Sequence, residues 1–232
     1  MLILAIDTAT KIGSVALYDD EVGIVGEINL YVKINHSNVI MKSIDSLFDL
    51  SGYTIKDVDK IAVTTGPGSF TGIRIGVAIA KGLAYSLKKP IIGINELDVL
   101  AETGEEREGL IVPLIDARKE RVYYSQYKYE NRKLVRKAEY KDGELRDILT
   151  NLKGEKVVFI GDGALVNQEL IKEIMGEENI IFSKVNSIPR AAMAAQMALQ
   201  HEDDNIYTLE PFYLNKSQAE REKEEREKRI IR

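Results

Sequence analysis

The stretch TTGPGSFTGIRIG, residues 64–76, decides the fold, because it joins a buried strand to a helix through a Gly-Pro-Gly turn. The strand is the apolar run at 61–65, and the helix opens with small residues and continues to about residue 88. Small residues recur at four-residue spacing and therefore lie on one helix face: Gly68, Gly72, Gly76, Ala80 and Ala84. We call this face the glycine stripe.

The glycine stripe needs a physical reason, because a glycine in a helix interior costs about 0.5–1 kcal/mol relative to alanine. Close approach of another backbone is the first interpretation, and that backbone can belong to a neighbouring element or to a second chain. A cradle for a phosphate group is the competing interpretation. The choice between a packing scaffold and a nucleotide site is the central question that the sequence raises.

The composition restricts the class of protein. The chain has 232 residues, 44% of them hydrophobic, which suits one large domain or two small ones with a buried core. A formal net charge of −5 argues against broad binding to nucleic acid, which depends on a basic surface. The chain lacks cysteine, a run of about 18 apolar residues and the features of a signal peptide, so we expect a cytoplasmic protein without a membrane segment.

The order of the predicted elements repeats, which indicates two similarly folded lobes. An apolar run ending in Asp7 opens the first half, and another ending in Asp116 opens the second. Each is followed by two more strands, a helix, a strand and a helix, so the βββαβα order of an α/β protein appears twice. The predicted division is a first lobe at 1–103, a second lobe at 104–216 and a charged tail at 217–232.

Two turns could together hold a nucleotide between the lobes. The first strand ends in a carboxylate and hydroxyls that suit a phosphate group, and a Gly-Asp-Gly turn in the second lobe could present backbone N–H groups. Both turns also have ordinary structural explanations, as an Asx or ST turn and as an Asp-Gly turn. The predicted vestigial nucleotide cleft comprises Asp7, Thr8, Thr10, Gly161, Asp162 and Gly163.

Other kinds of site find little support in the sequence. The chain has two histidines, no His-x-x-x-His pair and no cysteine, so we predict no metal site. No serine lies in a Gly-x-Ser-x-Gly motif, so we predict no catalytic nucleophile either. Tyrosines in the alternating strand predicted at 121–129 could stack on bases, but the glutamates beside them favour aromatic packing within the protein.

Four segments give the chain a resemblance to a known family: DTAT at 7–10 with SVA at 14–16, GPGSFTGIRIG at 66–76, PIIGI at 90–94 and PFYL at 211–214. Together they resemble the TsaB (YeaZ) family over nearly the whole chain. The resemblance implies a two-lobed, duplicated actin-like fold, of the ASKHA or ribonuclease-H-like type. It also implies a non-catalytic partner of TsaD, the enzyme that completes N6-threonylcarbamoyladenosine at position 37 of tRNAs reading ANN codons.

The resemblance further implies partners and a lost site. TsaD carries a metal-binding His-x-x-x-His after a Pro-Ile-x-Gly-Val-Asn strand, and the matching positions here hold Glu96 and Leu100. Because leucine cannot ligate a metal, we expect neither a metal nor a cofactor in this chain. The implied assembly is a heterodimer with TsaD, with TsaE as a further member, a homodimer when the chain is alone, and tRNA contact only through the complex.

In this interpretation the helix that carries the glycine stripe and the helix predicted at about 38–50 form the face that meets the partner. The residues predicted for this interface are Gly68, Gly72, Ile73, Gly76, Ala80, Ile40 and Ile44. The alternative is a nucleotide-binding phosphotransferase or ATPase of the same fold, which would use Asp7, Thr8, Thr10, Asp116 and Asp162.

Overall fold

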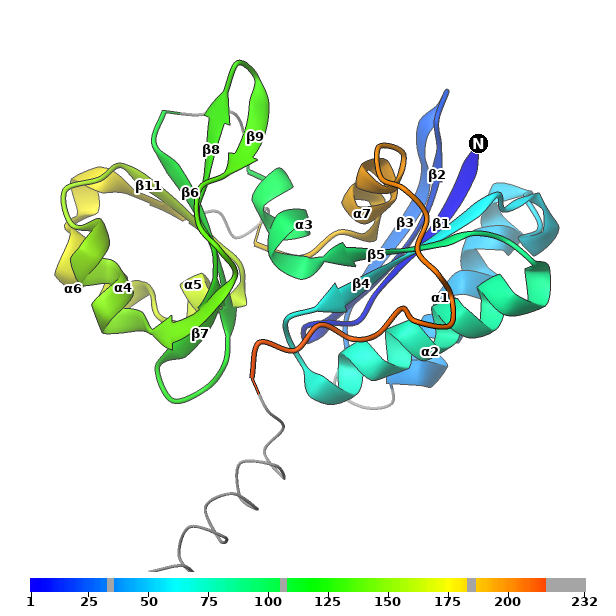
Figure 1. The fold of residues 1–232 in the computed structure, drawn as a ribbon, viewed down its shortest axis with the longest axis horizontal. Coiled ribbons are helices and arrows are strands. Elements are labelled where there is room, and N and C mark those ends of the chain that lie inside the picture. The colour runs from blue at the N-terminus through cyan, green and yellow to red at the C-terminus, as the bar shows by residue number, and fades with distance from the viewer. Residues whose placement is uncertain (33–35, 105–107, 183–186, 216–232) are drawn as a thin grey trace, which may run out of the picture.

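The computed structural model describes residues 1–32, 36–104, 108–182 and 187–215, so the predicted charged tail lies outside the described residues. Figure 1 shows two lobes side by side, each built around a mixed β-sheet, with helix α3 (Glu96–Glu102) between them. No helix in the described ranges is both long enough and apolar enough to cross a membrane.

Lobe one contains a five-stranded sheet in the order β3-β2-β1-β4-β5. The first three strands pair antiparallel, whereas β4 and β5 are parallel to β1. The strands are β1 (Leu2–Asp7), β2 (Ile12–Asp19), β3 (Gly23–Tyr31), β4 (Lys60–Gly66) and β5 (Ile91–Asn95). The helices are α1 (His36–Ser51), the short 3₁₀ helix Ile55–Asp57 and α2 (Phe70–Leu87), followed by α3.

Lobe two repeats this arrangement with the sheet order β10-β7-β6-β11-β12. Its strands are β6 (Leu110–Asp116), β7 (Arg121–Tyr124), β8 (Tyr127–Glu130), β9 (Lys133–Arg136), β10 (Lys141–Glu144), β11 (Val157–Ile160) and β12 (Ile180–Phe182). Its helices are α4 (Leu145–Leu152), α5 (Asp162–Val166), α6 (Gln168–Met175) and a short 3₁₀ helix at Glu177–Asn179. Two antiparallel strands flank β6 on one side and two parallel strands follow on the other, as around β1, so the duplicated actin-like order is confirmed.

The strand predicted at 121–129 is in fact two strands. The chain leaves β7 at Ser125, whose hydroxyl donates to the carbonyl oxygen of Ala138 at 2.7 Å. It then forms β8, which pairs with β6 and with β9 in a separate hairpin. The hairpin turn places Asn131 and Arg132 at positive φ, a pattern that matches the twist of antiparallel strands. Alternating side chains alone do not reveal such a change of pairing partner.

Each sheet buries both of its faces. In lobe one, alternate residues of β1 point to opposite sides, with Leu4 packed toward α1 and α2 and Ile3 packed toward helix α7 (Ala191–Ala198). In lobe two, α4, α5 and α6 cover one face around Phe159, and α3 covers the other. Helix α3, which ends the first half of the chain, therefore packs against the sheet of lobe two. Helix α7, from the second half, packs against the sheet of lobe one.

The chain thus returns to lobe one after lobe two, which corrects the predicted division at 104–216. Helix α7 completes the core of lobe one, and residues 199–215 then cross its outer strand, as the orange segment of Figure 1 shows. Asp204 accepts a hydrogen bond from the backbone of Gly93 at 2.8 Å, and the amide of Phe212 donates to the carbonyl oxygen of Thr65 at 2.7 Å. This segment covers the edge of β5 that would otherwise be open.

Candidate functional site

The glycine stripe packs against the turn between β1 and β2 of the same chain. A Cβ atom at Gly68 would lie 2.1 Å from the carbonyl oxygen of Ala9, and one at Gly72 would lie 2.1 Å from that of Thr8. A Cβ at Gly76 would lie 2.4 Å from the Thr8 hydroxyl oxygen. Of the two interpretations of the stripe, the structure therefore favours close approach of a backbone, and that backbone belongs to lobe one itself.

This packing fixes the beginning of α2 on the turn. The hydroxyl of Thr8 donates to the carbonyl oxygen of Gly72 at 2.7 Å, and the amide of Ser69 donates to the carbonyl oxygen of Ala9 at 2.6 Å. The side chain of Ser69 caps the helix by accepting from the amide of Gly72 at 3.2 Å. The three glycines of the stripe and the serine that caps the helix are thus explained by a single helix-to-turn contact.

The residues predicted for the partner interface lie inside lobe one rather than on its surface. Ile40, Ile44, Ile73 and Ala80 are buried in the core between the sheet and the two helices, Gly72 and Gly76 are buried at the turn, and Gly68 is partly covered. That part of the prediction is wrong for a physical reason: a stripe of small residues reports close approach but does not say from which side. The exposed face of α2 lies on a different side of the helix from the glycine stripe. It consists of Thr71, Arg74, Ala78, Gly82 and Tyr85.

In the first predicted phosphate turn, both threonine hydroxyls and one carboxylate oxygen of Asp7 form hydrogen bonds within the protein. Asp7 and Thr8 are fully buried, and Thr10 is nearly so. One carboxylate oxygen of Asp7 accepts hydrogen bonds from the amide of Ala9 at 2.9 Å and from the hydroxyl of Thr64 at 2.8 Å. The hydroxyl of Thr10 accepts from the amide of Ile12 at 3.1 Å. These contacts are those of the ordinary Asx and ST turn that was the structural alternative.

The second predicted turn is closed in the same manner. A Cβ at Gly161 would lie 2.3 Å from the carbonyl oxygen of Leu114, and one at Gly163 would lie 2.9 Å from the same atom. Both glycines are needed so that α5 can approach β6, and both are buried. Asp162 accepts from the amide of Asp116 at 3.0 Å, and burial raises the pKa of Asp162.

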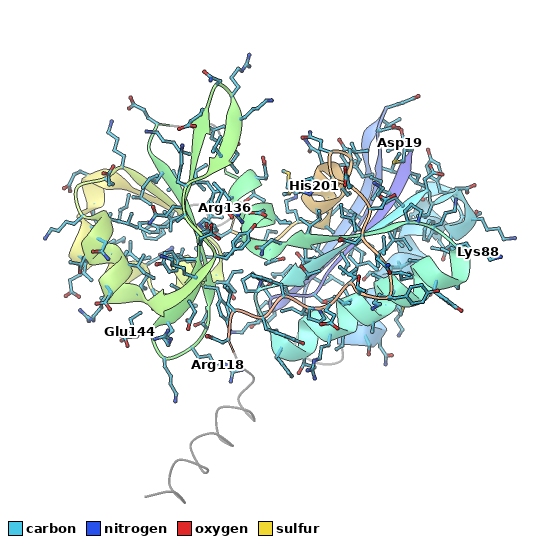
Figure 2. The ribbon with its side chains drawn as sticks, viewed as in Figure 1. Asp19, Lys88, Arg118, Arg136, Glu144 and His201 are labelled. Atoms are coloured by element: carbon cyan, nitrogen blue, oxygen red, sulfur yellow. The ribbon has the colours of Figure 1, made fainter. Side chains whose placement is uncertain are left out.

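The loop between β6 and β7, which corresponds to the β1–β2 turn of lobe one, carries large side chains. Arg118, Lys119 and Glu120 all have positive φ, at 68°, 54° and 56°, a conformation that L-residues adopt rarely. The amide of Arg118 donates to Asp116 at 2.8 Å, and Figure 2 shows Arg118 at the lower edge of lobe two. This loop offers no glycine to let a phosphate approach its backbone.

Sequence reasoning missed the role of Glu96, which it treated only as a lost metal position. Glu96 begins α3, is fully buried, and lies against Asp7. Burial, together with the nearby charges of Asp7 and Asp162, raises the pKa of Glu96 well above its ordinary value. Among the described residues, no group of three or more His, Cys, Asp and Glu side chains is arranged to hold a metal ion.

A second polar contact ties the lobes together through α3. Asp98 accepts hydrogen bonds from the hydroxyls of Tyr127 and Tyr140, both at 2.5 Å. The guanidinium of Arg136 lies 4.0 Å from the centre of the Tyr140 ring. The Phe212 ring packs edge-on against the same tyrosine ring. Figure 2 labels Arg136 where lobe two approaches α3. Tyr127 of the predicted aromatic strand thus serves to pack lobe two against α3.

The fold defines a protein of the actin-like class, in which α2 packs closely on the β1–β2 turn and α5 packs closely on the end of β6. The family model described as "TsaD: tRNA N6-adenosine threonylcarbamoyltransferase" matches residues 14–223. The tRNA threonylcarbamoyladenosine biosynthesis protein TsaB of Bacillus subtilis is 35% identical over 222 residues, covering 95% of this chain and 96% of that protein. The TsaB of Escherichia coli is 31% identical over 232 residues, covering 94% and 96%.

A solved structure shows the same fold. YeaZ from Pseudomonas aeruginosa superposes with a TM-score of 0.77 at 24% identity, covering 92% of this chain and 99% of that one. The chain belongs to the TsaB family of tRNA threonylcarbamoyladenosine biosynthesis proteins.

The closed turns predict how the protein responds to nucleotide. We expect about 1 mM Mg²⁺–ATP to leave its melting temperature unchanged, because the hydroxyls of Thr8 and Thr10 already have partners and both glycines of the Gly-Asp-Gly turn pack against Leu114. A ligand present at about 100 times its Kd would stabilise the protein by about 2.7 kcal/mol, which a thermal melt detects easily. A melting temperature that rises with ATP concentration would instead support the phosphotransferase alternative.

Proposed function

We propose that this chain is a non-catalytic subunit that supports a TsaD-like threonylcarbamoyltransferase in modifying tRNA. The observation that supports the proposal is the close packing of two helices on the predicted phosphate turns: the lobes keep the actin-like arrangement, while α2 packs on the β1–β2 turn and α5 packs on the end of β6. An actin-like protein whose phosphate turns are packed against its own helices is suited to act through its surface. The family to which the chain belongs supplies the pathway.

The surface best suited to a partner is the outer face of α2, defined by Thr71, Arg74, Ala78, Gly82 and Tyr85. Gly82 has open space around its missing side chain and Ala78 is exposed, so a partner helix can approach the backbone closely at the centre of this face. Tyr85 is 67% exposed at one end, and on α1 Met41 is 39% exposed. Exposed aromatic and methionine side chains around a small-residue centre are typical of interface cores.

The partner we propose for this face is TsaD, because one family model describes both TsaD and nearly the whole of this chain. A partner with the same two-helix face could pack against it about a pseudo-twofold axis. In the absence of TsaD, a second copy of this chain would take the same place. TsaE would join as a further member, and tRNA would be reached through the cytoplasmic complex.

The substitution Ala78→Arg tests the proposal. We expect it to weaken binding to the TsaD of the same organism by at least about tenfold, because a long charged side chain separates the helices at the centre of the face. The melting temperature should not change, since Ala78 is exposed. Isothermal titration calorimetry measures the binding, and co-purification from the host identifies the partner.

The matched control is Val166→Arg, at a position that is 67% exposed on α5 of lobe two. This variant should bind TsaD as the unmodified chain does. Equal binding by both variants would exclude the outer face of α2 as the interface. Binding lost with Val166→Arg alone would move the interface to lobe two.

A further inference from the structure

Two acidic side chains meet in the interior of the protein between the end of β1 and the start of α3. Asp7 and Glu96 both have no solvent-exposed surface. Asn95 caps α3 by accepting a hydrogen bond from the amide of Leu97 at 2.9 Å, which fixes where Glu96 begins the helix. We call Asp7 and Glu96 the carboxyl pair.

The carboxyl pair has fewer hydrogen-bond donors around it than its four oxygens need. Thr64 gives its single hydroxyl proton to one oxygen of Asp7, and the amide of Ala9 donates to that same oxygen. Within the described part of the chain, the other oxygen of Asp7 and both oxygens of Glu96 receive no hydrogen bond from any other group. Two ionised carboxylates in this position would repel each other and leave three buried oxygens unpaired, an arrangement that proteins strongly disfavour.

The charged groups around the pair do not neutralise it. Asp162, on α5 of lobe two, adds a further negative charge near Glu96. Asp116, at the end of β6, faces Asp162 in turn. Lys11, in the turn after β1, acts on Asp162 and is itself exposed. No cation among the described residues forms an ion pair with either member of the carboxyl pair.

We propose that Asp7 and Glu96 share one proton at neutral pH and that this proton joins α3 to the β1–β2 turn. The proton resides on Glu96 and is donated to the free oxygen of Asp7, so one added hydrogen pairs two of the three unpaired oxygens and removes one of the two buried charges. Loss of the proton leaves two buried negative charges in contact, and the beginning of α3 is then repelled from the turn. The pair is a pH-sensitive connection built into the junction of the two lobes.

The geometry gives the direction of the pH dependence. Burial raises the pKa of Asp7 and, with the charge of Asp7, raises the pKa of Glu96 well above its ordinary value of 4.5. The folded protein therefore binds a proton that the unfolded chain has already released at neutral pH. The stabilising effect is complete below the unfolded pKa, and it is lost as the pH rises through the folded pKa.

The test measures the proton directly and through stability. In protein labelled with ¹³C at glutamate carboxyls, we expect one glutamate signal to remain in the protonated range at pH 7, and Glu96→Gln should remove it. The side-chain amide that this substitution introduces can donate to Asp7 without needing a proton. The folding equilibrium constant of the unmodified chain relative to Glu96→Gln should therefore fall as the pH rises above the unfolded pKa, by at most tenfold per pH unit.

Glu102→Gln is the matched control, because it removes a charge from the same helix at a half-buried position away from Asp7. Its stability relative to the unmodified chain should change much less over this pH range. The proposal is overturned if every glutamate signal of the unmodified protein is ionised at pH 7. It is also overturned if Glu96→Gln and Glu102→Gln show the same pH dependence. The spectrum of the unmodified chain decides the question even if Glu96→Gln does not fold.

Discussion

Replacing Gly72 with alanine is expected to destabilise the protein by at least about 3 kcal/mol. The new Cβ would lie 2.1 Å from the carbonyl oxygen of Thr8, a buried backbone atom in a turn that cannot shift without breaking its contacts. Overpacking of a core typically costs about 1–3 kcal/mol, and a clash with backbone lies at the upper end of that range or beyond it. Chemical denaturation followed by circular dichroism measures the effect.

Gly82→Ala is the matched control for this prediction. Gly82 lies on the same helix, but no atom lies within 4 Å of the position that its Cβ would take. Alanine there should stabilise the helix by up to about 1 kcal/mol, because it restricts the unfolded chain and favours helix. If Gly72→Ala unfolds at the same denaturant concentration as the unmodified protein, the helix-to-turn contact is not as close as the structure indicates.

Substitutions at these two glycines also distinguish an effect on folding stability from an effect on partner binding. Because Gly72 faces inward and Gly82 faces outward, a larger side chain at Gly72 should act on stability and one at Gly82 on partner binding. A Gly72→Leu protein that folds normally but fails to bind TsaD would restore the interface first predicted from the sequence. Light scattering and thermal melting on the same samples distinguish these outcomes.

Replacing Asp98 with alanine is expected to cost about 3–5 kcal/mol and to loosen the attachment of lobe two to α3. Asp98 accepts two short hydrogen bonds, from Tyr127 and Tyr140, and Tyr127 is buried. Hydrogen bonds to a charged group contribute about 1.5–3 kcal/mol each, and a buried hydroxyl left without an acceptor adds a penalty. Denaturation gives the stability, and limited proteolysis between the lobes reports the loosening.

The two tyrosines provide graded controls. Tyr140→Phe and Tyr127→Phe each remove one donor and leave Asp98 with the other, so each should cost less than Asp98→Ala. Burial and the negative charge of Asp98 raise the pKa of both tyrosine hydroxyls, so they should remain protonated where ordinary tyrosines ionise. Equal stability of Asp98→Ala and the unmodified chain would mean that α3 is held by its apolar contacts alone.

The sequence was sufficient for the order of elements in lobe one and for the start of lobe two, because an apolar run ending in aspartate opens each half and turn residues mark the strand ends. It did not reveal the β8–β9 hairpin of lobe two. The sequence did not predict which sheet α7 packs against. That helix is rich in alanine, and small apolar side chains fit equally well against either sheet. The choice between the lobes depends on contacts with residues more than 150 positions away, such as the hydrogen bond from Ala191 to Ser14.

Only part of the candidate site could be predicted from the sequence. The four-residue spacing of glycine shows that a backbone comes close, but the spacing is the same for contact within one chain and between two chains. Asp7 was identified by its position at the end of a strand. Glu96 was not, because a glutamate at a helix start is ordinarily exposed and favourable to the helix dipole. Only the three-dimensional arrangement shows that the two carboxyls are buried together.

The return of the chain to lobe one has a consequence for synthesis on the ribosome. The sheet of lobe one is made first, but one of its faces stays uncovered until α7 and residues 199–215 have emerged. During most of translation that apolar face is available to chaperones or to misassociation, and the lobe that begins the protein is the last to be completed. Folding of lobe one should therefore await the emergence of α7 and residues 199–215 rather than follow completion of the first half of the chain.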